Sequence, residues 1–372
     1  DQYGNVDTNY TGTALVSTWE NDDIVDAELT FTAGAATFTT SNLTTAVIDQ
    51  RFDLEEQNGT LSDLTTPFDV VHASGYKLVF DQQPTNTTAG ETISPAITVQ
   101  VQDEYDNLVS TASDDVTLSI ETGAGTLLGT TTVSASSGVA TFDDLNIETK
   151  DTYTLNASAS GLEYDISDSF YIEAASAATL DIVQQPTDTT AGEAISPAVV
   201  AHVEDIYGNL NESSTDTVIM NVDGPNADGS ELEGDQTVEA VSGVATFDKL
   251  YINETGSFYL MCSSMGLAGE NSDTFTVSPA EVNELRIVTT PGPSTAGQET
   301  GEFVVERYDE FGNLNNSGEF TFTVSTTSSG PWEFRGTSGG ANTTELTITD
   351  GSSSQNFFYY DETAGDHTIS VS

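Results

Sequence analysis

Apolar and polar residues alternate in short runs along the chain, and no run shows the 3.6-residue period of an amphipathic helix. In the clearest run, Ile97, Val99 and Val101 alternate with Thr and Gln residues. A period of two predicts a strand with one buried face. Asp and Asn residues follow at once, and they favour turns because their side chains bond to the nearby backbone. The pattern therefore predicts an all-β chain of short strands and tight turns.

The unit formed by this strand and its turn recurs. Segment 81–108 contains a proline, a Thr-Ala-Gly bend, the alternating strand and an Asp-rich turn. It returns at 184–210 and, more weakly, at 289–314, and its tail alone stands at 1–5. The first Asp of the turn falls at positions 1, 103, 205 and 309, which gives spacings of 102, 102 and 104 residues. Repeats of this length are too long for a solenoid and match one β-sandwich each.

The repeats predict four domains, at 1–75, 76–173, 174–279 and 280–372. The first opens at the turn and lacks the two strands that precede it elsewhere. The fourth stops one strand early. We expect either that the natural chain continues beyond both ends, which we favour, or that a neighbouring subunit inserts a strand. The segments that join successive domains have a constant length and contain no Gly/Ser linker. We therefore expect the domains to form a semi-rigid rod.

The fourth repeat departs most from the pattern. Arg307 falls where the middle repeats have an inward-facing valine, His367 replaces an aromatic residue of a core strand, and Trp332 lies in a Gly/Ser-rich insertion. In the third repeat, Cys262 aligns with small apolar residues of the other repeats. As the only cysteine it forms no intrachain disulfide, and we expect it to be a small buried hydrophobe.

Composition adds a strong charge asymmetry. Seven Lys and Arg residues against 60 Asp and Glu residues give a net charge of -53, spread through all repeats. Self-repulsion of this size destabilises a compact state at low salt, and molar salt screens it. The charge indicates a halophilic surface, or a polyanionic surface that concentrates cations. Nucleic acid and anionic membranes are unsuitable partners for it. This segment contains no signal peptide and no transmembrane run of 18 apolar residues.

Sequons for N-glycosylation are more frequent than composition predicts, and they indicate an extracellular protein despite the lack of disulfides. Three of them follow the Asp-rich turn, which we expect to be an exposed loop. Another, at Asn156, lies between inward residues and should point to solvent. The nine candidate sites are Asn9, Asn42, Asn58, Asn86, Asn156, Asn211, Asn253, Asn315 and Asn342.

The run of Pro, Thr-Ala-Gly, alternating valines, Asp-x-Tyr-Gly-Asn and Ser-Gly-Val-Ala-Thr-Phe resembles the bacterial Ig-like repeats of invasin/intimin-type adhesins and of archaeal surface proteins. The resemblance covers the two middle repeats fully and the outer two in part. It implies tandem seven-stranded Ig-like β-sandwiches and no catalytic residues. Such repeats serve as stalks, lattice subunits and adhesins alike, so the resemblance is specific for the fold and not for the function.

The acidic turns are the candidate metal sites, because Ca²⁺ prefers hard oxygen ligands. Their residues are Asp103, Glu104, Asp106, Asp309 and Glu310. The equivalent turn of the third repeat has fewer acids, and no spacing matches an EF-hand loop. We therefore favour structural turns, with Ca²⁺ as the alternative and no required cofactor. His72, His202 and His367 lie in different repeats without ligand spacing, which argues against zinc.

Two motifs resemble enzyme signatures. Residues 336–340 match the G-x-S-x-G elbow, and Asp361 and His367 follow in the order of a hydrolase triad, but no strand–turn–helix surrounds them. Residues 123–129 are one residue longer than a dinucleotide fingerprint and lack a βαβ unit. The sequence therefore predicts that the chain is not an enzyme.

Taken together, these features predict a structural glycoprotein of the cell surface. The expected role is a subunit of an archaeal, halophilic surface layer (S-layer) or filament, with identical or related chains, cations and N-glycans as partners. One alternative is an adhesin stalk that presents a binding domain outside this segment. Another is a secreted enzyme whose Ig-like accessory domains are seen here. Contacts between identical chains would favour the first role, and a dissimilar terminal domain in the full gene would favour the others.

Overall fold

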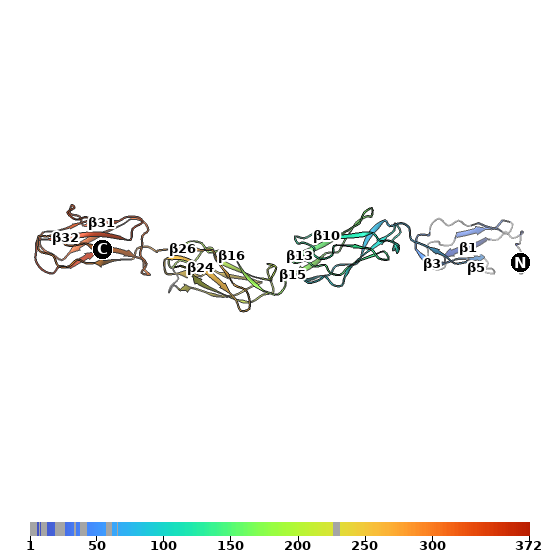
Figure 1. Ribbon diagram of the computed structural model, residues 1–372, viewed down its shortest axis with the longest axis horizontal. Coiled ribbons are helices and arrows are strands. Elements are labelled where there is room, and N and C mark those ends of the chain that lie inside the picture. Colours follow the sequence, from blue (N-terminus) through green and yellow to red (C-terminus); the bar gives the residue numbers. More distant parts are fainter. Residues whose placement is uncertain are drawn as a thin grey trace. The chain divides into compact units, whose positions relative to one another are not determined.

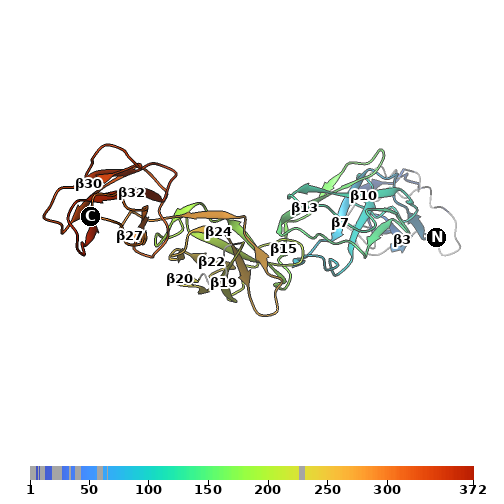
Figure 2. The same cartoon turned by 60° about the vertical axis from the view of Figure 1, so that its left-hand side comes forward.

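The computed structural model describes residues 6, 8, 13–18, 27–32, 35–37, 43–56, 62–64, 66–225 and 231–372. These residues form strands and no helix, which confirms the all-β prediction (Figures 1 and 2). The chain divides into two compact units, 1–175 and 176–372, which are described separately. No helix in the described ranges is long and apolar enough to cross a membrane.

The first repeat contributes one sheet and one further strand pair. The sheet has the order β2-β1-β4-β5, and β3 pairs with β6. Ala14 and Val16 on β1 are buried. The rings of Phe52 and Phe68 lie 5.3 Å apart. Trp19 lies outside the described residues. The strands are β1 (Thr13–Thr18), β2 (Ala27–Thr30), β3 (Val47–Gln50), β4 (Phe52–Glu56), β5 (Ser62–Leu64) and β6 (Phe68–Val70).

The second repeat is a sandwich of two sheets. One sheet contains β7 (Lys77–Gln82), β9 (Ile97–Gln102) and β12 (Val139–Phe142). The other has the order β11-β10-β13-β15-β8, with β14 beside β13. Ile97, Val99 and Val101 are fully buried and their polar neighbours are not, which confirms the predicted alternation. The strands of the second sheet are β8 (Thr87–Thr88), β10 (Asp115–Thr122), β11 (Thr132–Ser134), β13 (Asp151–Ser158), β14 (Asp165–Ile166) and β15 (Phe170–Glu173).

The third repeat has two equivalent sheets and a further strand pair, β20 with β23. Cys262 lies on the inward face of β24, opposite Met220, and burial raises the pKa of its thiol to about 12. It is the small buried hydrophobe that the sequence predicted. The strands are β16 (Thr179–Gln184), β17 (Thr189–Thr190), β18 (Val199–Glu204), β19 (Thr217–Asp223), β20 (Leu232–Glu233), β21 (Thr237–Glu239), β22 (Val244–Phe247), β23 (Tyr251–Ile252), β24 (Gly256–Ser263), β25 (Glu270–Asn271) and β26 (Phe275–Ser278).

The fourth repeat keeps the sandwich but differs at its edges. One sheet has the order β27-β28-β32-β30 and the other β31-β29-β33. Trp332, expected in an insertion, instead lies in β30, which pairs with β32 and extends the sheet (Figure 2). The alternation of this short segment is hidden by the Gly and Ser residues around it. The strands are β27 (Glu284–Thr289), β28 (Phe303–Tyr308), β29 (Phe320–Thr326), β30 (Trp332–Arg335), β31 (Glu345–Ile348), β32 (Ser354–Asp361) and β33 (Ile369–Val371).

Strand register shows that the repeats are structurally equivalent. Leu118 on β10 faces Ala157 on β13, and Val324 on β29 faces Val371 on β33. The strand β33 is therefore the counterpart of the penultimate strands β13 and β24. The three buried hydrophobic clusters lie within residues 78–172, 180–277 and 303–359. The domain boundaries proposed from the sequence stay predictions.

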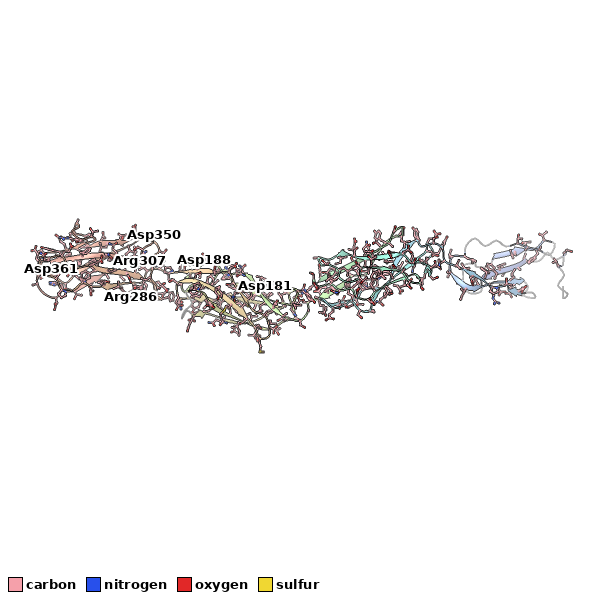
Figure 3. The ribbon with its side chains drawn as sticks, viewed as in Figure 1. Asp181, Asp188, Arg286, Arg307, Asp350 and Asp361 are labelled. Carbon is pink, nitrogen blue, oxygen red and sulfur yellow. The ribbon has the colours of Figure 1, made fainter. Side chains whose placement is uncertain are left out.

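Arg307 points into the core of the fourth repeat, as its register predicted. Figure 3 labels its place in that repeat. Only 1% of Arg307 is exposed. Its Nε donates to the carbonyl of Asn315 at 2.7 Å, and its Nη2 donates to the carbonyls of Gly318 and Ser352 at 2.8 and 2.9 Å. Burial lowers the pKa of this guanidinium, and the nearby Asp350 opposes that shift. The cation is thus held by backbone dipoles and not by a contacting carboxylate.

Candidate functional site

The Asp-rich turn after β9 is built around one buried carboxylate. Asp103 Oδ1 accepts hydrogen bonds from the N–H groups of Tyr105 and Asn107, both at 2.9 Å. The side-chain amide of Asn107 donates to Oδ1 at 3.1 Å and to Oδ2 at 3.0 Å. Asp106 adopts a φ of 71°, a left-handed conformation that Asp tolerates better than most residues. The turn is therefore the Asx structure that the sequence predicted.

The same side chains also bond to the preceding repeat. Asn107 Nδ2 donates to the carbonyl of Thr44 at 2.7 Å, and the N–H of Ala46 donates to Asn107 Oδ1 at 2.8 Å. Asp103 Oδ2 accepts from the N–H of Ala73, between β6 and β7, at 2.8 Å. We call this Asp–Asn pair, with its three bonds to the preceding repeat and the connecting segment, the joint clamp.

The junction between the third and fourth repeats has a second joint clamp. Asn313 Nδ2 donates to the carbonyl of Asn253 at 2.7 Å, and the N–H of Thr255 donates to Asn313 Oδ1 at 3.2 Å. Asp309 Oδ2 accepts from the N–H of Ala280 at 3.0 Å. The partners lie 29 to 60 residues before the turn and occupy the same places as in the first clamp. Two independent junctions therefore use one design.

An aromatic contact accompanies the second clamp. Gly192 lies in the Thr-Ala-Gly bend of the third repeat, and a Cβ built there would lie 2.3 Å from Cζ of Phe311. The ring of Phe311, from the turn of the fourth repeat, therefore rests directly on the backbone of this bend. Gly192 has a φ of 79°, which already favours glycine. The close ring of Phe311 is a second reason for glycine at this position.

The turn of the third repeat has the same internal geometry. Asp205 Oδ1 accepts from the N–H groups of Tyr207 and Asn209 at 2.8 and 2.9 Å, and Asn209 Nδ2 donates to Asp205 Oδ2 at 2.8 Å. Asp205 is 1% exposed. The three turns that the structure describes thus share a buried carboxylate that accepts bonds from N–H donors.

Burial and hydrogen bonding have opposite effects on the ionisation of Asp103. Burial raises the pKa of the carboxyl, but donors from Asn107, Ala73 and Tyr105 stabilise the charged form more strongly and lower the pKa to about 2. The clamp is therefore fully ionised, and at full strength, at neutral pH.

The five candidate metal ligands have separate roles in the structure. Asp103 and Asp309 direct their oxygens at N–H groups, Asp106 pairs with Lys77, and Glu104 and Glu310 are exposed. In the described part of the chain, no group of three or more His, Cys, Asp or Glu residues is arranged to hold a metal ion. The Asp-rich segments act as structural turns, and calcium binding stays a prediction.

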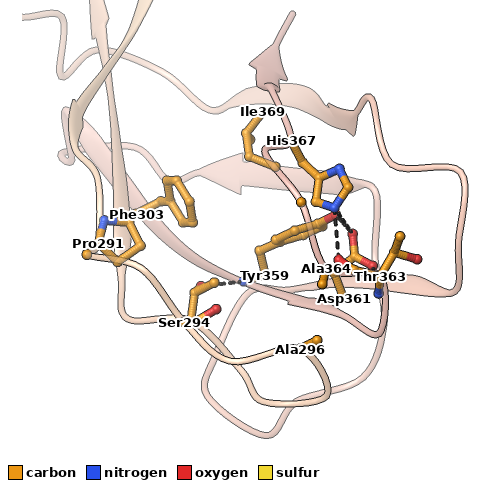
Figure 4. Close-up of a pocket in the computed structure, with 13 residues that line it drawn as sticks. Pro291, Ser294, Ala296, Phe303, Tyr359, Asp361, Thr363, Ala364, His367 and Ile369 are labelled. Carbon is orange, nitrogen blue, oxygen red and sulfur yellow. Dashed lines mark hydrogen bonds and ion pairs between the residues drawn. The ribbon is translucent and has the colours of Figure 1, made fainter.

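The residues of the hydrolase-like motif are only partly brought together. His367 Nε2 lies 3.5 Å from Asp361 Oδ2 and 3.0 Å from the carbonyl of Thr363 (Figure 4). Tyr359 also donates to Asp361, a contact that sequence reasoning missed because Tyr359 belongs to an apolar strand. Ser338, however, donates its Oγ proton to Glu299 at 2.6 Å. The absence of enzymatic activity stays a prediction.

Glycosylation sequons differ in accessibility. Asn86 and Asn342 are exposed, and Asn156 is half-buried between two buried neighbours on β13. The expected exposure is wrong for Asn211 and Asn315, which are 8% and 3% exposed. Both follow the turn, but their side chains fold back to bond the backbone of residues 213 and 317. Asn253 is half-buried beside the second clamp. Asn9, Asn42 and Asn58 lie outside the described residues.

No protein-family model matches the chain, and a search of curated proteins gives no match. Among solved structures, the chain is similar to the adhesin FdeC of Escherichia coli at 16% identity and a TM-score of 0.38, covering 81% of this chain and 94% of that one. It is similar to InvD of Yersinia pseudotuberculosis at 16% identity and a TM-score of 0.34, covering 79% and 84%. It is also similar to domains 1–6 of the surface layer protein SbsC, at 13% identity and a TM-score of 0.22. That match covers 97% of this chain and 48% of the other one. Because all these TM-scores lie below 0.5, the function is inferred from the joints of the chain itself.

Proposed function

We propose that the chain is a structural protein of the cell surface, in which Ig-like repeats act as spacers of fixed geometry within a surface layer or filament. The joint clamp is the observation that carries this proposal. At each of two junctions, an Asp–Asn pair makes three hydrogen bonds to the preceding repeat and the connecting segment. Bending a junction would break several of these bonds at once.

A fixed junction is useful to a protein that maintains distance or transmits force, and it has no evident use for a soluble catalyst. The acidic surface and the exposed sequons support the finer form of the proposal. In that form the chain is a glycosylated subunit of an archaeal, halophilic surface polymer, and cations such as Ca²⁺ lie between neighbouring acidic surfaces. The same clamp would also suit an adhesin stalk.

The clamp can be tested by measuring how well it fixes a junction. Spin labels are attached at two exposed positions on either side of the second clamp, through Thr237→Cys and Ser325→Cys. The buried Cys262 is protected from labelling by its raised pKa. Pulsed electron–electron double resonance measures the distance between the two labels and should give one narrow distance distribution. Asn313→Ala should broaden it, because both bonds to the third repeat are lost.

Glu310→Ala is the matched control, because Glu310 is exposed in the same turn and should leave the distribution unchanged. An equally broad distribution in the parent chain and in Asn313→Ala would refute a fixed junction. Electron microscopy of the purified chain at molar salt, with and without Ca²⁺, separates the two surface roles. Ordered sheets or filaments support the polymer subunit, and isolated particles under all conditions support the stalk.

A further inference from the structure

The two sheets of the third repeat have outer faces of different character. On the sheet of β16, β18 and β22, Asp181 lies opposite His202, and Glu204 follows two residues after His202 on the same strand. Burial raises the pKa of Glu204, and three nearby carboxylates, that of Asp181 among them, raise it further. This outer face therefore gathers like charges, and it would repel the same face of another copy of the chain.

The outer face of the other sheet has an apolar centre on β19 and β24, both labelled in Figure 2. Ile219 lies on β19, and Tyr259 and Met261 lie on β24. Their neighbours along each strand are buried core residues, so the three side chains point outward. Ile219 is 40% exposed, and the other two are half-buried. Met261 lies diagonally across from Ile219 and two residues from Tyr259, so the three form one patch, which we call the apolar stripe.

Uncharged polar residues surround the apolar stripe on the same face. They include Thr217, Asn221, Thr237, Ser263, Thr276 and Ser278. Among the described residues of these strands, two carboxylates also point outward. Asp223 accepts a hydrogen bond from the hydroxyl of Tyr259 at 3.0 Å, and Glu239 lies on the edge strand β21. No glycosylation sequon falls on these strands, so the described centre of the face carries neither a charge nor an attachment site for sugar.

The second repeat shows that the fold does not require this apolar surface. Its residues at the positions of the apolar stripe are Thr117, Thr154 and Asn156. It also places carboxylates on this face, since Asp115 and Glu173 stand where the third repeat has Thr217 and Ser278. The equivalent face is thus polar and acidic in one repeat and apolar at its centre in the other, so the apolar stripe has a role beyond folding.

The charge of the chain indicates which partner fits this face. A basic partner would be recognised by carboxylates, which the described residues at the centre of the face do not include. A partner that is itself acidic requires a face without carboxylates, since opposed like charges in a contact are strongly unfavourable. A second copy of this chain, with its net charge of -53, is such a partner, and its own stripe supplies apolar surface to be buried.

We propose that the apolar stripe binds the apolar stripe of a second copy of the chain. The two faces pack together in an isologous contact, to which each copy contributes the same surface. Ile219, Tyr259 and Met261 of both copies form its core, and the surrounding Thr, Ser and Asn side chains form a polar rim. Molar salt strengthens the contact because it screens the net charge of both copies. The inference deepens the proposed surface polymer and rests on it for the choice of a second copy as partner.

The test measures self-association of the 372-residue chain by sedimentation velocity in about 1 M NaCl, where the Debye length is about 3 Å. The weight-average sedimentation coefficient should rise with protein concentration. The stripe variant combines Ile219→Thr and Tyr259→Thr. Its dissociation constant should be at least about tenfold higher than that of the parent chain, because buried apolar area is lost. The second repeat has Thr at both positions, so the fold of the variant should be retained.

The control variant combines Val200→Thr and Val244→Thr. These changes remove two half-buried valines from the outer face of the opposite sheet, so this variant should associate as the parent chain does. The NMR signal of the Met261 methyl group gives a second measurement. It should shift with protein concentration, whereas the methyl signal of the core residue Met220 should not.

The possible outcomes separate this contact from the proposed function. An unchanged sedimentation coefficient at all concentrations, or equal association of the stripe variant and the parent chain, would overturn the proposal, as would equal weakening in both variants. Ordered sheets or filaments that the stripe variant forms as readily as the parent chain would overturn the contact alone and leave the surface polymer standing. A broad distance distribution at the spin-labelled junction would count against the proposed function and not against the contact.

Discussion

Single buried polar residues in this chain are held by backbone groups more than by opposite charges. The carboxylate of Asp103 accepts bonds from backbone N–H groups and one amide, and the guanidinium of Arg307 donates to three carbonyls. With only seven Lys and Arg residues for 60 acids, most carboxylates have no cationic partner to use. Backbone dipoles are present at every residue, and the fold uses them instead.

Loss of the Arg307 side chain should destabilise the fourth repeat. Arg307→Ala removes a large buried side chain and leaves the carbonyls of Asn315, Gly318 and Ser352 without their donor. We expect a loss of ~2–4 kcal/mol in the free energy of unfolding, from the cavity and the unsatisfied groups together. Urea unfolding measures it, followed by the fluorescence of Trp332 in a chain that carries Trp19→Phe. The exposed Arg286 is the control, since its ion pair with Glu284 and its contact with the Tyr308 ring lie at the surface and their loss should cost much less.

Accessibility should decide which described sequons carry glycans. The sugar is attached to Nδ2, and Asn86 and Asn342 are exposed and use only Oδ1 in their hydrogen bonds, to Tyr171 N–H and Phe334 N–H. Asn315 is buried and donates its Nδ2 to the carbonyl of Ala280. Glycopeptide mass spectrometry of native material should therefore find glycans at Asn86 and Asn342 but not at Asn315. Modification of Asn315 together with unmodified Asn86 and Asn342 would contradict this expectation.

Among the structural elements, the Asp-rich turn shows what the sequence could predict. Its local form follows from Asx chemistry, so the turn itself was predictable. Its partners Thr44 and Ala46 lie 63 and 61 residues earlier, and their carbonyl and N–H carry no sequence signal. The exposure expected for Asn315 was wrong for the same reason, because the bond from its Nδ2 to Ala280 spans 35 residues. Local pattern gives the element, and only the packed fold gives its contacts.

The first joint clamp should weaken only in strongly acidic solution. Hydrogen bonding lowers the pKa of Asp103 from 3.8 to about 2 despite its burial, so the folded state binds its proton less tightly than the unfolded chain does. The stabilisation is therefore complete above about pH 4 and is lost as the pH falls through about 2. The carboxyl carbon shift of Asp103, followed by NMR, should have its midpoint near pH 2. A midpoint of Asp103 near the ordinary carboxyl value of 3.8 would contradict the clamp.

Across the whole molecule, the fold was predictable where the sequence repeats. It was not predictable where one repeat departs from the shared pattern. The spacing of the turns and the alternation of residues such as Ile97 and Val99 led directly to all-β sandwiches with these residues in the core. The fourth repeat is where prediction was weakest. Trp332 forms an edge strand, and Asp361, His367 and Tyr359 form a polar cluster where the other repeats have apolar residues. The repeat alignment placed His367 in a core strand, but it could not show that Asp361 and Tyr359 contact each other, because these side chains depart from the pattern.

The net charge of -53 should make the stability of the whole molecule depend on salt. Only a few acids are paired with cations, so mutual repulsion opposes the compact state. The Debye length falls from about 10 Å at 0.1 M salt to about 3 Å at 1 M, which removes most repulsion between neighbouring surface carboxylates. We expect the melting temperature to rise by at least about 5 °C over this range, or ~1 kcal/mol for a 100-residue domain. NaCl and KCl should act alike because screening depends on ionic strength.

Sucrose separates screening from a general strengthening of burial, because it favours the compact state without shielding charge. At the same osmolality it should raise the melting temperature less than salt does. Sulfate tested against chloride at equal ionic strength gives a second check, since pure screening predicts equal effects and stronger burial predicts a larger effect of sulfate. Equal melting temperatures at 0.1 M and 1 M salt would show that the folded chain tolerates its charge unaided. In that case the acidic surface would need another explanation, such as direct binding of cations between neighbouring chains.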